Sequence, residues 1–212
     1  MSKTETHPLP HQSKKFRKPE KLEAIMNATY RAVASKGFAQ ISMNDIAIEA
    51  GEHKSLLFYY FKNKDQLFLE LFHYLSQKYV DMIFDIVSHP ASVDKKLTKG
   101  FNVFHQFMVD EPKWLLMILE LIVHSTHKPE YRAEVISLYK QLMGLIGSGI
   151  SDAKKSKEIK RHFDDDVVSS LIIATLTGLG VLYVLDSQAM DFSKAYQYYK
   201  EMVDNFIKTE KT

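Results

Sequence analysis

Apolar residues recur every three or four positions along most of this chain, which is the spacing of one face of an α-helix. The first stretch begins at Pro19, which suits a first helical turn, and closes at Gly37, which suits a left-handed C-terminal cap. No segment alternates apolar and polar residues between turn signals, as a strand does. The pattern predicts an all-α protein of about nine helices. After the first, they are expected at 43–50, from about 54, and at 64–87, 93–109, 112–125, 129–156, 164–186 and 192–208.

Two short helices follow the first one and are joined by a turn. Ser42–Asp45 fits a capping box, in which the serine oxygen accepts the third amide of the new helix, and Gly51 ends that helix. Six large apolar or aromatic residues then occupy Leu56–Phe61. Successive helical positions turn by about 100°, so Leu57 and Phe61 can share the buried face while some aromatic neighbours point outward. Two short helices after a longer supporting helix predict a helix-turn-helix.

Charge is unevenly distributed along the 212 residues. Residues 1–64 hold 11 Lys and Arg against 6 Asp and Glu, a net of +5, and the remainder has a net of −3. A basic N-terminal third indicates contact with a polyanion. The cluster Lys14, Lys15, Arg17 and Lys18 suits an arm in a DNA minor groove, and a solvated tail is the alternative.

Composition excludes several classes of protein. The chain is 45% hydrophobic and 25% charged, as globular proteins are, and it has no cysteine for disulfides, thiolate metal sites or a nucleophile. The apolar runs at 114–123 and 171–185 are shorter than the roughly 20 residues that cross a bilayer, so they predict buried helices. No secretory signal is evident, and the expected location is the cytoplasm.

Five stretches stand at characteristic spacing, namely IMNATYRAVASKGF at 25–38, SMNDIA at 42–47, AG at 50–51, LFYYF at 57–61 and KDQL at 64–67. With them, residues 20 to about 70 resemble the DNA-binding domain of the tetracycline-repressor (TetR) family of bacterial and archaeal regulators. The resemblance implies a basic arm at 1–18, a helix-turn-helix domain at 19–66 and a helical ligand-binding and dimerisation domain at 67–212.

The resemblance also implies which residues meet DNA. Ser42 matches a residue that bonds a phosphate, and the helix after Gly51 matches the one that enters the major groove. Several positions depart from the usual pattern, Glu52 and Leu56 among them, so the operator sequence does not follow from relatives. The expected DNA contacts are Ser42, Met43, His53, Lys54, Ser55, Leu56, Phe58, Tyr59 and Lys64.

The last two helices are expected to join two subunits. By resemblance, the helices at about 164–186 and 192–208 pair with their symmetry mates in a homodimer. Independently, residues 171–185 are apolar nearly all round and contain Gly178 and Gly180, small residues that permit close helix approach. The alternative is the central core helix of a monomer.

Aromatic and thioether side chains at 101–121 suit a site for a small hydrophobic or amphipathic ligand, although the same spacing is typical of plain core. Glu120 and His124 lie four residues apart and can bond each other instead. His124 and His127 lack further metal ligands, so no metal site and no cofactor are predicted. The candidate ligand contacts are Phe101, Phe104, His105, Met108, Trp114, Met117, Glu120, Leu121, His124 and Tyr139.

No catalytic motif is present, so the chain is not expected to be an enzyme. We interpret it as a homodimeric repressor that binds palindromic operator DNA and is released by an apolar or amphipathic molecule. A ligand would tilt the helix at 64–87 and spoil the spacing of about 34 Å between two recognition helices. The alternative, suggested by Glu52 and Leu56, is a helical ligand-binding or scaffold dimer that has lost specific DNA binding.

Overall fold

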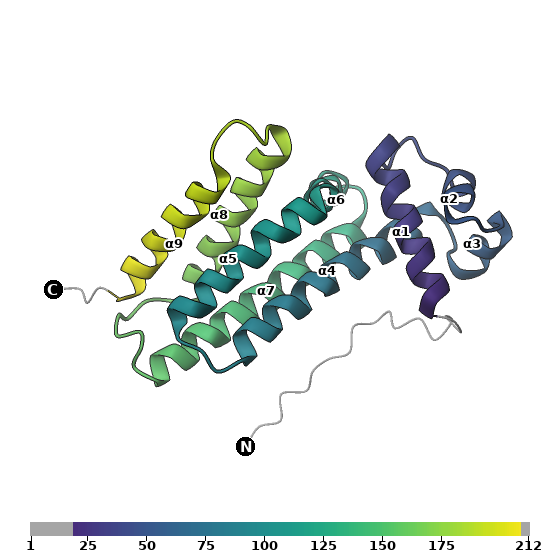
Figure 1. Ribbon diagram of the computed structural model, residues 1–212. Helices are drawn as coiled ribbons and strands as arrows, with labels where there is room; N and C mark the ends of the chain where they lie inside the picture. The colour runs from purple at the N-terminus through teal and green to yellow at the C-terminus, as the bar shows by residue number, and fades with distance from the viewer. Residues whose placement is uncertain (1–18, 209–212) are drawn as a thin grey trace, which may run out of the picture. The chain divides into compact units, whose positions relative to one another are not determined.

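A computed structural model describes residues 19–208, and within that range the chain is all helical, as predicted. The basic arm expected at 1–18 lies outside the described residues. Helix ends agree with the predicted ones to within one residue. The nine described helices are α1 (Pro19–Lys36), α2 (Met43–Ala50), α3 (Lys54–Tyr60), α4 (Lys64–Ser88), α5 (Val93–Asp110), α6 (Pro112–His124), α7 (Pro129–Lys155), α8 (Asp165–Leu185) and α9 (Phe192–Lys208) (Figure 1).

The chain divides into two compact units between Leu71 and Phe72. The first contains α1, α2, α3 and the start of α4, and the second contains the rest of α4 with α5–α9. Helix α4 is therefore continuous across the division. The domain boundary placed after residue 66 by sequence stays a prediction.

The first unit is built around fully buried side chains from each of its helices. Ile25 of α1, Ile46 of α2 and Leu57 of α3 have no exposed surface, and Phe61 is 1% exposed. The rings of Phe38 and Phe68 stack with centroids 4.0 Å apart, which holds the segment after α1 against the start of α4. Each short helix thus buries one face in a shared core, because a helix of seven or eight residues is not stable alone.

Local capping sets where α2 begins and ends. The Ser42 hydroxyl accepts the Asp45 amide at 3.2 Å and the Asp45 carboxylate accepts the Ser42 amide at 2.9 Å, as the capping box predicts. Gly51 has φ +64°, and its amide bonds back to the end of α2. This left-handed residue turns the chain from α2 into α3 at no steric cost.

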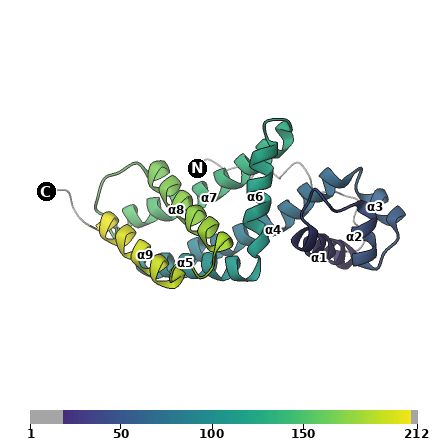
Figure 2. The same cartoon turned by 90° about the horizontal axis from the view of Figure 1, so that it is seen from above.

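In the second unit, α8 packs against α6 and α7, and α9 packs against α5 (Figures 1 and 2). At Gly180, α8 packs closely against its own chain, because a Cβ there would lie 2.9 Å from Leu115 Cδ2 and 3.3 Å from Met108 Sδ. The close approach that the sequence assigned to a partner subunit is thus intramolecular at Gly180. Gly178 is exposed, with open space around it.

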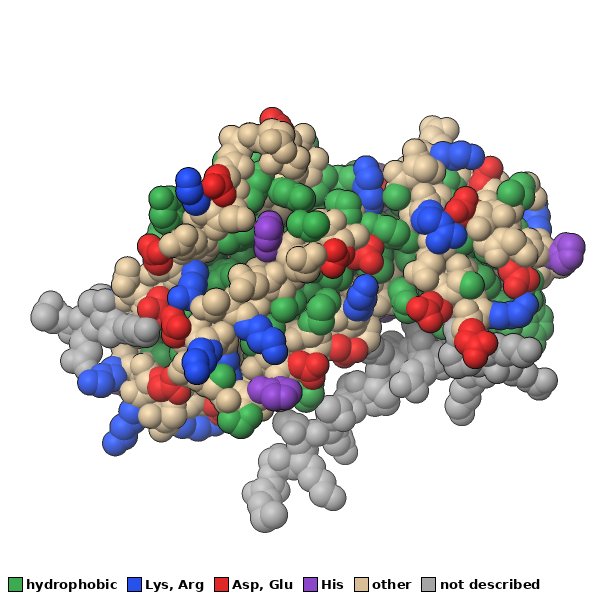
Figure 3. Space-filling view, viewed as in Figure 1, with side chains coloured by type: hydrophobic (Ala, Val, Ile, Leu, Met, Phe, Trp, Pro, Cys, Tyr) green, Lys and Arg blue, Asp and Glu red, His purple; other side chains and the backbone are tan. Residues whose placement is uncertain are grey.

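An exposed apolar stripe runs along α8 and continues on α9, and we call it the α8–α9 stripe. Among the described helices, α8 alone is long and apolar enough to cross a membrane by length and composition. Only 33% of its most apolar window is buried, so α8 is less buried than the sequence predicted. Apolar side chains are visible over this part of the second unit in Figure 3. The stripe consists of Val167, Leu171, Ala174, Gly178, Leu182 and Leu185 on α8 and Tyr198, Met202 and Phe206 on α9.

Candidate DNA interface and ligand cavity

Helix α3 presents a narrow outward face while Leu57 anchors it from behind. Phe58 is 48% exposed and Tyr59 is 65% exposed, whereas Leu57 is fully buried. The Lys54 ammonium lies 5.7 Å from the centre of the Phe58 ring, which keeps a positive charge beside the exposed aromatics. His53, Lys54 and Ser55 are exposed as well, and Leu56 is half-buried. The mixed aromatic and basic run is therefore split between core and surface, as its helical angles require.

The N-terminus of α2 is organised by Ser42 and Asp45. The Ser42 hydroxyl donates to Asp45 Oδ2 at 2.6 Å, and that hydrogen bond is the main reason why the pKa of Asp45 falls to about 2. Lys36 lies 3.4 Å from the same carboxylate and adds to the effect. Ser42 remains exposed, but Met43 is 7% exposed and packs in the core. Only the backbone of Met43 is thus available to a partner.

Two charged residues near α3 are engaged within the first unit. The Lys64 ammonium donates to the carbonyls of Phe38 and Ile41 at 3.0 Å and of Ala39 at 3.4 Å, so its three protons serve the segment between α1 and α2. The Glu52 carboxylate accepts from Lys21 Nζ at 2.8 Å. Lys64 therefore stabilises the fold of the first unit in this structure. The negative charge of Glu52 is neutralised by Lys21 of α1.

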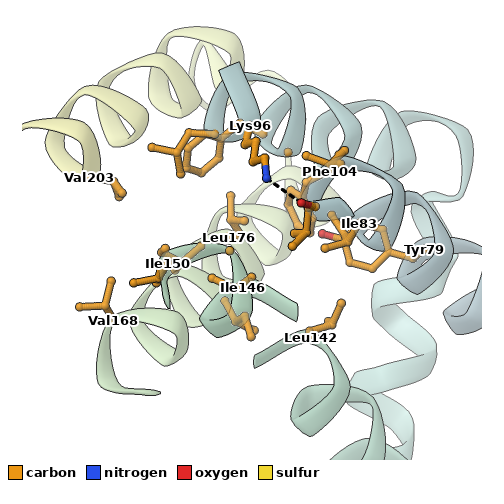
Figure 4. A pocket seen from close by; sticks show the side chains of 18 of the residues that line it. Tyr79, Ile83, Lys96, Phe104, Leu142, Ile146, Ile150, Val168, Leu176 and Val203 are labelled. Carbon is orange, nitrogen blue, oxygen red and sulfur yellow. Dashed lines mark hydrogen bonds between the residues drawn. The ribbon is translucent and has the colours of Figure 1, made fainter. Parts of the chain in front are cut away.

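The second unit holds a cavity that is partly open to solvent and is lined by residues of all six of its helices, α4–α9 (Figure 4). It contains about 1180 Å³ of empty space, including the part open to solvent. Its walls are formed mainly by aliphatic side chains, among them Ile83, Leu142, Ile146 and Leu176.

Few polar groups reach the cavity wall. Tyr79, Tyr139 and Thr177 bring hydroxyls, and Lys96 brings an ammonium. Burial raises the pKa of Tyr79 well above its usual range, so this phenol is neutral at physiological pH. Trp114 closes one side, with its ring centre 5.5 Å from that of Tyr79 and its indole N–H donating to Ser76 Oγ at 3.4 Å. The site therefore favours an aliphatic ligand with very few polar atoms.

The structure brings four of the ten predicted ligand contacts to this cavity, namely Phe101, Phe104, Trp114 and Tyr139. The others lie outside its lining. Met108, Met117 and Leu121 are buried in the core, His105 is half-buried beside Tyr196, and Glu120 is half-buried. His124 is exposed and its ring meets that of Tyr131 edge-on.

Sequence reasoning missed most of the wall, because it comes from α4, α7, α8 and α9. One signal was available in α5: Lys96 shares a helical face with Val93, Leu97, Gly100 and Phe101. A lysine on an apolar face is unusual enough to mark a site. The aliphatic positions of α7 and α8 could not be assigned to the cavity from the sequence, since a packed core and a cavity wall use the same residue types.

A short helix with an exposed face in a helix-turn-helix, together with a separate helical unit that holds an apolar cavity, is typical of DNA-binding regulators that take a ligand. The family model described as bacterial regulatory proteins, tetR family, matches residues 25–71. Residues 25–71 thus match the DNA-binding domain of that family, which confirms the resemblance seen in the sequence. The relatives of the chain are transcriptional regulators and not enzymes, as predicted.

Curated relatives extend the similarity beyond that domain. The fatty acid metabolism regulator protein of Bacillus subtilis is 20% identical over 177 residues, which cover 84% of this chain and 90% of the relative. The HTH-type transcriptional regulator EthR of Mycolicibacterium smegmatis is 28% identical over 158 residues, covering 74% and 69%.

Solved structures show the same fold. The regulator FadR of Bacillus subtilis in complex with stearoyl-CoA has a TM-score of 0.74 at 20% identity, covering 85% of this chain and 96% of its own. A TetR transcription regulator from Haloarcula marismortui has a TM-score of 0.77 at 19% identity, covering 90% and 99%. At such identities the likeness establishes the fold.

Proposed function

We propose that two copies of this chain bind a palindromic operator as a repressor and that a long aliphatic or amphipathic molecule in the cavity releases them. The observation that carries the proposal is the outward face of α3, where Lys54, Phe58 and Tyr59 are exposed on a helix fixed by Leu57. A helix of this size enters the major groove, which is wide enough to admit it. Transcriptional regulators of this kind work in the cytoplasm.

In this docking mode α3 supplies both kinds of contact. The Tyr59 hydroxyl and the Lys54 ammonium reach phosphates, while Phe58 and the exposed edge of Leu56 touch thymine methyl groups. Ser42, His53 and Ser55 complete the proposed surface from the N-termini of α2 and α3. Lys64 is left out of this set because its ammonium is committed to three carbonyls.

The α8–α9 stripe supports the dimer. Leu171 is 59% exposed and Leu185 is 75% exposed, an apolar surface that a second copy would bury. Ala174 and Gly178 lie four residues apart at its middle, so two α8 helices can approach closely there. The negative charge of Asp165 and Asp166 is confined to the first turn of α8. In such a dimer each copy contributes one recognition helix to one half of a palindromic operator.

Helix α4 connects the two activities. It begins in the unit that carries α3, and its later turns contribute Tyr79, Ile83 and Ile86 to the cavity wall. A ligand that displaces this wall moves α4 and with it the recognition helices. A hundredfold preference of the ligand for the displaced state corresponds to about 2.7 kcal/mol and would lower operator affinity by up to the same factor.

Operator binding is tested by fluorescence anisotropy with DNA from upstream of the protein's own gene, at two salt concentrations. We expect nanomolar affinity for the operator with a steep salt dependence. Addition of dodecanoate or dodecanoyl-CoA should lower that affinity. Lys54→Ala is expected to weaken binding, with Lys95→Ala on exposed α5 surface as the matched control. Binding that is weak and independent of sequence would contradict the proposal.

A helical scaffold dimer without specific DNA binding is the competing function suggested by Glu52 and Leu56. Its basis is weakened by the structure, since Glu52 pairs with Lys21 and Leu56 is half-buried. Neither residue places an unpaired negative charge or a large apolar patch at the groove. The same anisotropy measurement separates the two functions, because a scaffold dimer would show only weak attraction to any DNA.

A further inference from the structure

Lys96 is the single charged residue in the cavity wall of the described chain. It lies on the apolar face of α5, and its ammonium donates to the carbonyl of Val87 at 2.6 Å, near the C-terminal end of α4 (Figure 4). Every other lining side chain is aliphatic, aromatic or a neutral hydroxyl. Lys96 is half-buried, and an anion that reaches its ammonium from the apolar side would form a charge-assisted hydrogen bond.

The acidic residues around Lys96 have other partners. Asp152 is bonded to Lys155 at 2.9 Å, which is the main reason why the pKa of Asp152 is lowered, and Lys96 contributes less. Asp94 lies 2.7 Å from Lys200, and Glu158 accepts the amide of Val93 at 2.9 Å. Within the described residues Lys96 forms no ion pair. One of its three protons serves Val87, so the others are available to a ligand.

We propose that Lys96 binds the carboxylate of a long-chain aliphatic acid whose hydrocarbon tail fills the rest of the cavity. This inference rests on the proposed function, in which the cavity holds an aliphatic ligand, and it adds the head group that the site selects. A charge-assisted hydrogen bond in a low-dielectric site is stronger than one in water, which favours the acid over a neutral molecule of equal length. A coenzyme A thioester offers its anionic groups on the phosphates instead, beyond a neutral thioester.

Trp114 provides a direct readout. It is the only tryptophan in the chain and lies in the cavity wall, so its fluorescence reports ligand entry. The full-length protein is titrated with dodecanoate, dodecanol and dodecanoyl-CoA. We expect dodecanoate to bind at least tenfold more tightly than dodecanol, because only the acid pairs with Lys96.

Substitutions at Lys96 then isolate its charge. Lys96→Gln keeps a donor for the Val87 carbonyl and removes the charge, and Lys96→Met removes both. Either is expected to lower dodecanoate affinity by about tenfold to a hundredfold while leaving dodecanol unchanged, whereas Lys96→Arg retains the preference. Lys95→Met, which removes an exposed charge from the adjacent position, should match the unsubstituted protein. Unchanged thermal unfolding of Lys96→Gln shows that the fold is intact.

The outcomes separate this inference from the proposed function. Equal affinity of Lys96→Gln and the unsubstituted protein for dodecanoate would overturn the role of Lys96, while dodecanol binding would still support an aliphatic cavity. If Lys96→Gln lowers the affinity only for dodecanoyl-CoA, Lys96 does not bind a carboxylate and contacts the phosphates of coenzyme A instead. Failure of all three ligands to change Trp114 fluorescence or operator affinity would overturn the aliphatic ligand itself.

Discussion

The two units of this chain use apolar side chains in opposite ways. In the first, Ile25, Ile46 and Leu57 are completely buried, and three helices of 18, 8 and 7 residues leave little room for rearrangement. In the second, longer helices line about 1180 Å³ of empty space with the same residue types. A recognition helix must hold its geometry against DNA, whereas a ligand site must keep space that a core would fill.

The largest expected effect concerns the buried core of the first unit. Leu57→Ala should destabilise the first unit by about 2–5 kcal/mol, because it removes a fully buried side chain from a dense core. Phe58→Ala, at the next position but 48% exposed, should change the free energy of unfolding by less than about 0.5 kcal/mol. Urea unfolding measures both. Similar losses of stability for the two variants would mean that α3 has no distinct buried and exposed faces. Only Phe58→Ala should weaken operator binding while the protein stays folded.

Next in size is the contrast between two glycines of α8. Gly180→Ala should cost about 1–3 kcal/mol, because its Cβ would lie 2.9 Å from Leu115 Cδ2. Gly178→Ala has open space in the monomer and should stabilise the helix by about 0.4–1 kcal/mol. Thermal unfolding checks the first effect. Gly178→Leu should weaken the proposed dimer, which sedimentation measures, and a dimer unaffected by this variant would place the interface elsewhere.

Two lysines of the first unit should separate stability from binding. Lys64→Ala is expected to lower the free energy of unfolding by about 1–2 kcal/mol, since its ammonium bonds three carbonyls. Lys54→Ala should leave unfolding unchanged and reduce the salt slope of operator binding by about 1. Denaturation and anisotropy are measured on the same samples. A fully stable Lys64→Ala protein with weakened operator affinity would return Lys64 to the DNA contacts.

The smallest effect concerns the cap of α2. Ser42→Ala should cost about 1 kcal/mol in chemical denaturation. Its partner Asp45 has a folded-state pKa lowered to about 2, so the ionised carboxylate favours the folded protein above the ordinary value of 3.8. That contribution is lost as the pH falls from about 4 to about 2. Asp45→Asn should therefore be less stable than the unsubstituted protein at pH 6 and no different near pH 2; a gap that persists at pH 2 would contradict this origin.

Much of the first unit could be predicted because its signals are local. Ser42–Asp45 specifies a helix start, Gly51 specifies a left-handed turn, and the helical angle between Leu57 and Phe58 decides which side chain is buried. The helix ends of the second unit were equally predictable, since they depend on Pro, Gly and capping residues near each end. Caps and periodicity act over a few residues, which a sequence displays directly.

Only the tertiary structure decided how shared residue types are used. In the folded chain, the Lys64 ammonium bonds carbonyls after α1, and Gly180 packs against the core of its own chain. Lys96 lines a cavity together with Leu142 and Leu176, which are far away in the sequence. Local patterns determine that a residue is helical and which way it faces. What it faces depends on how distant helices pack, because burial, empty space and the partner of a charge are properties of several segments together.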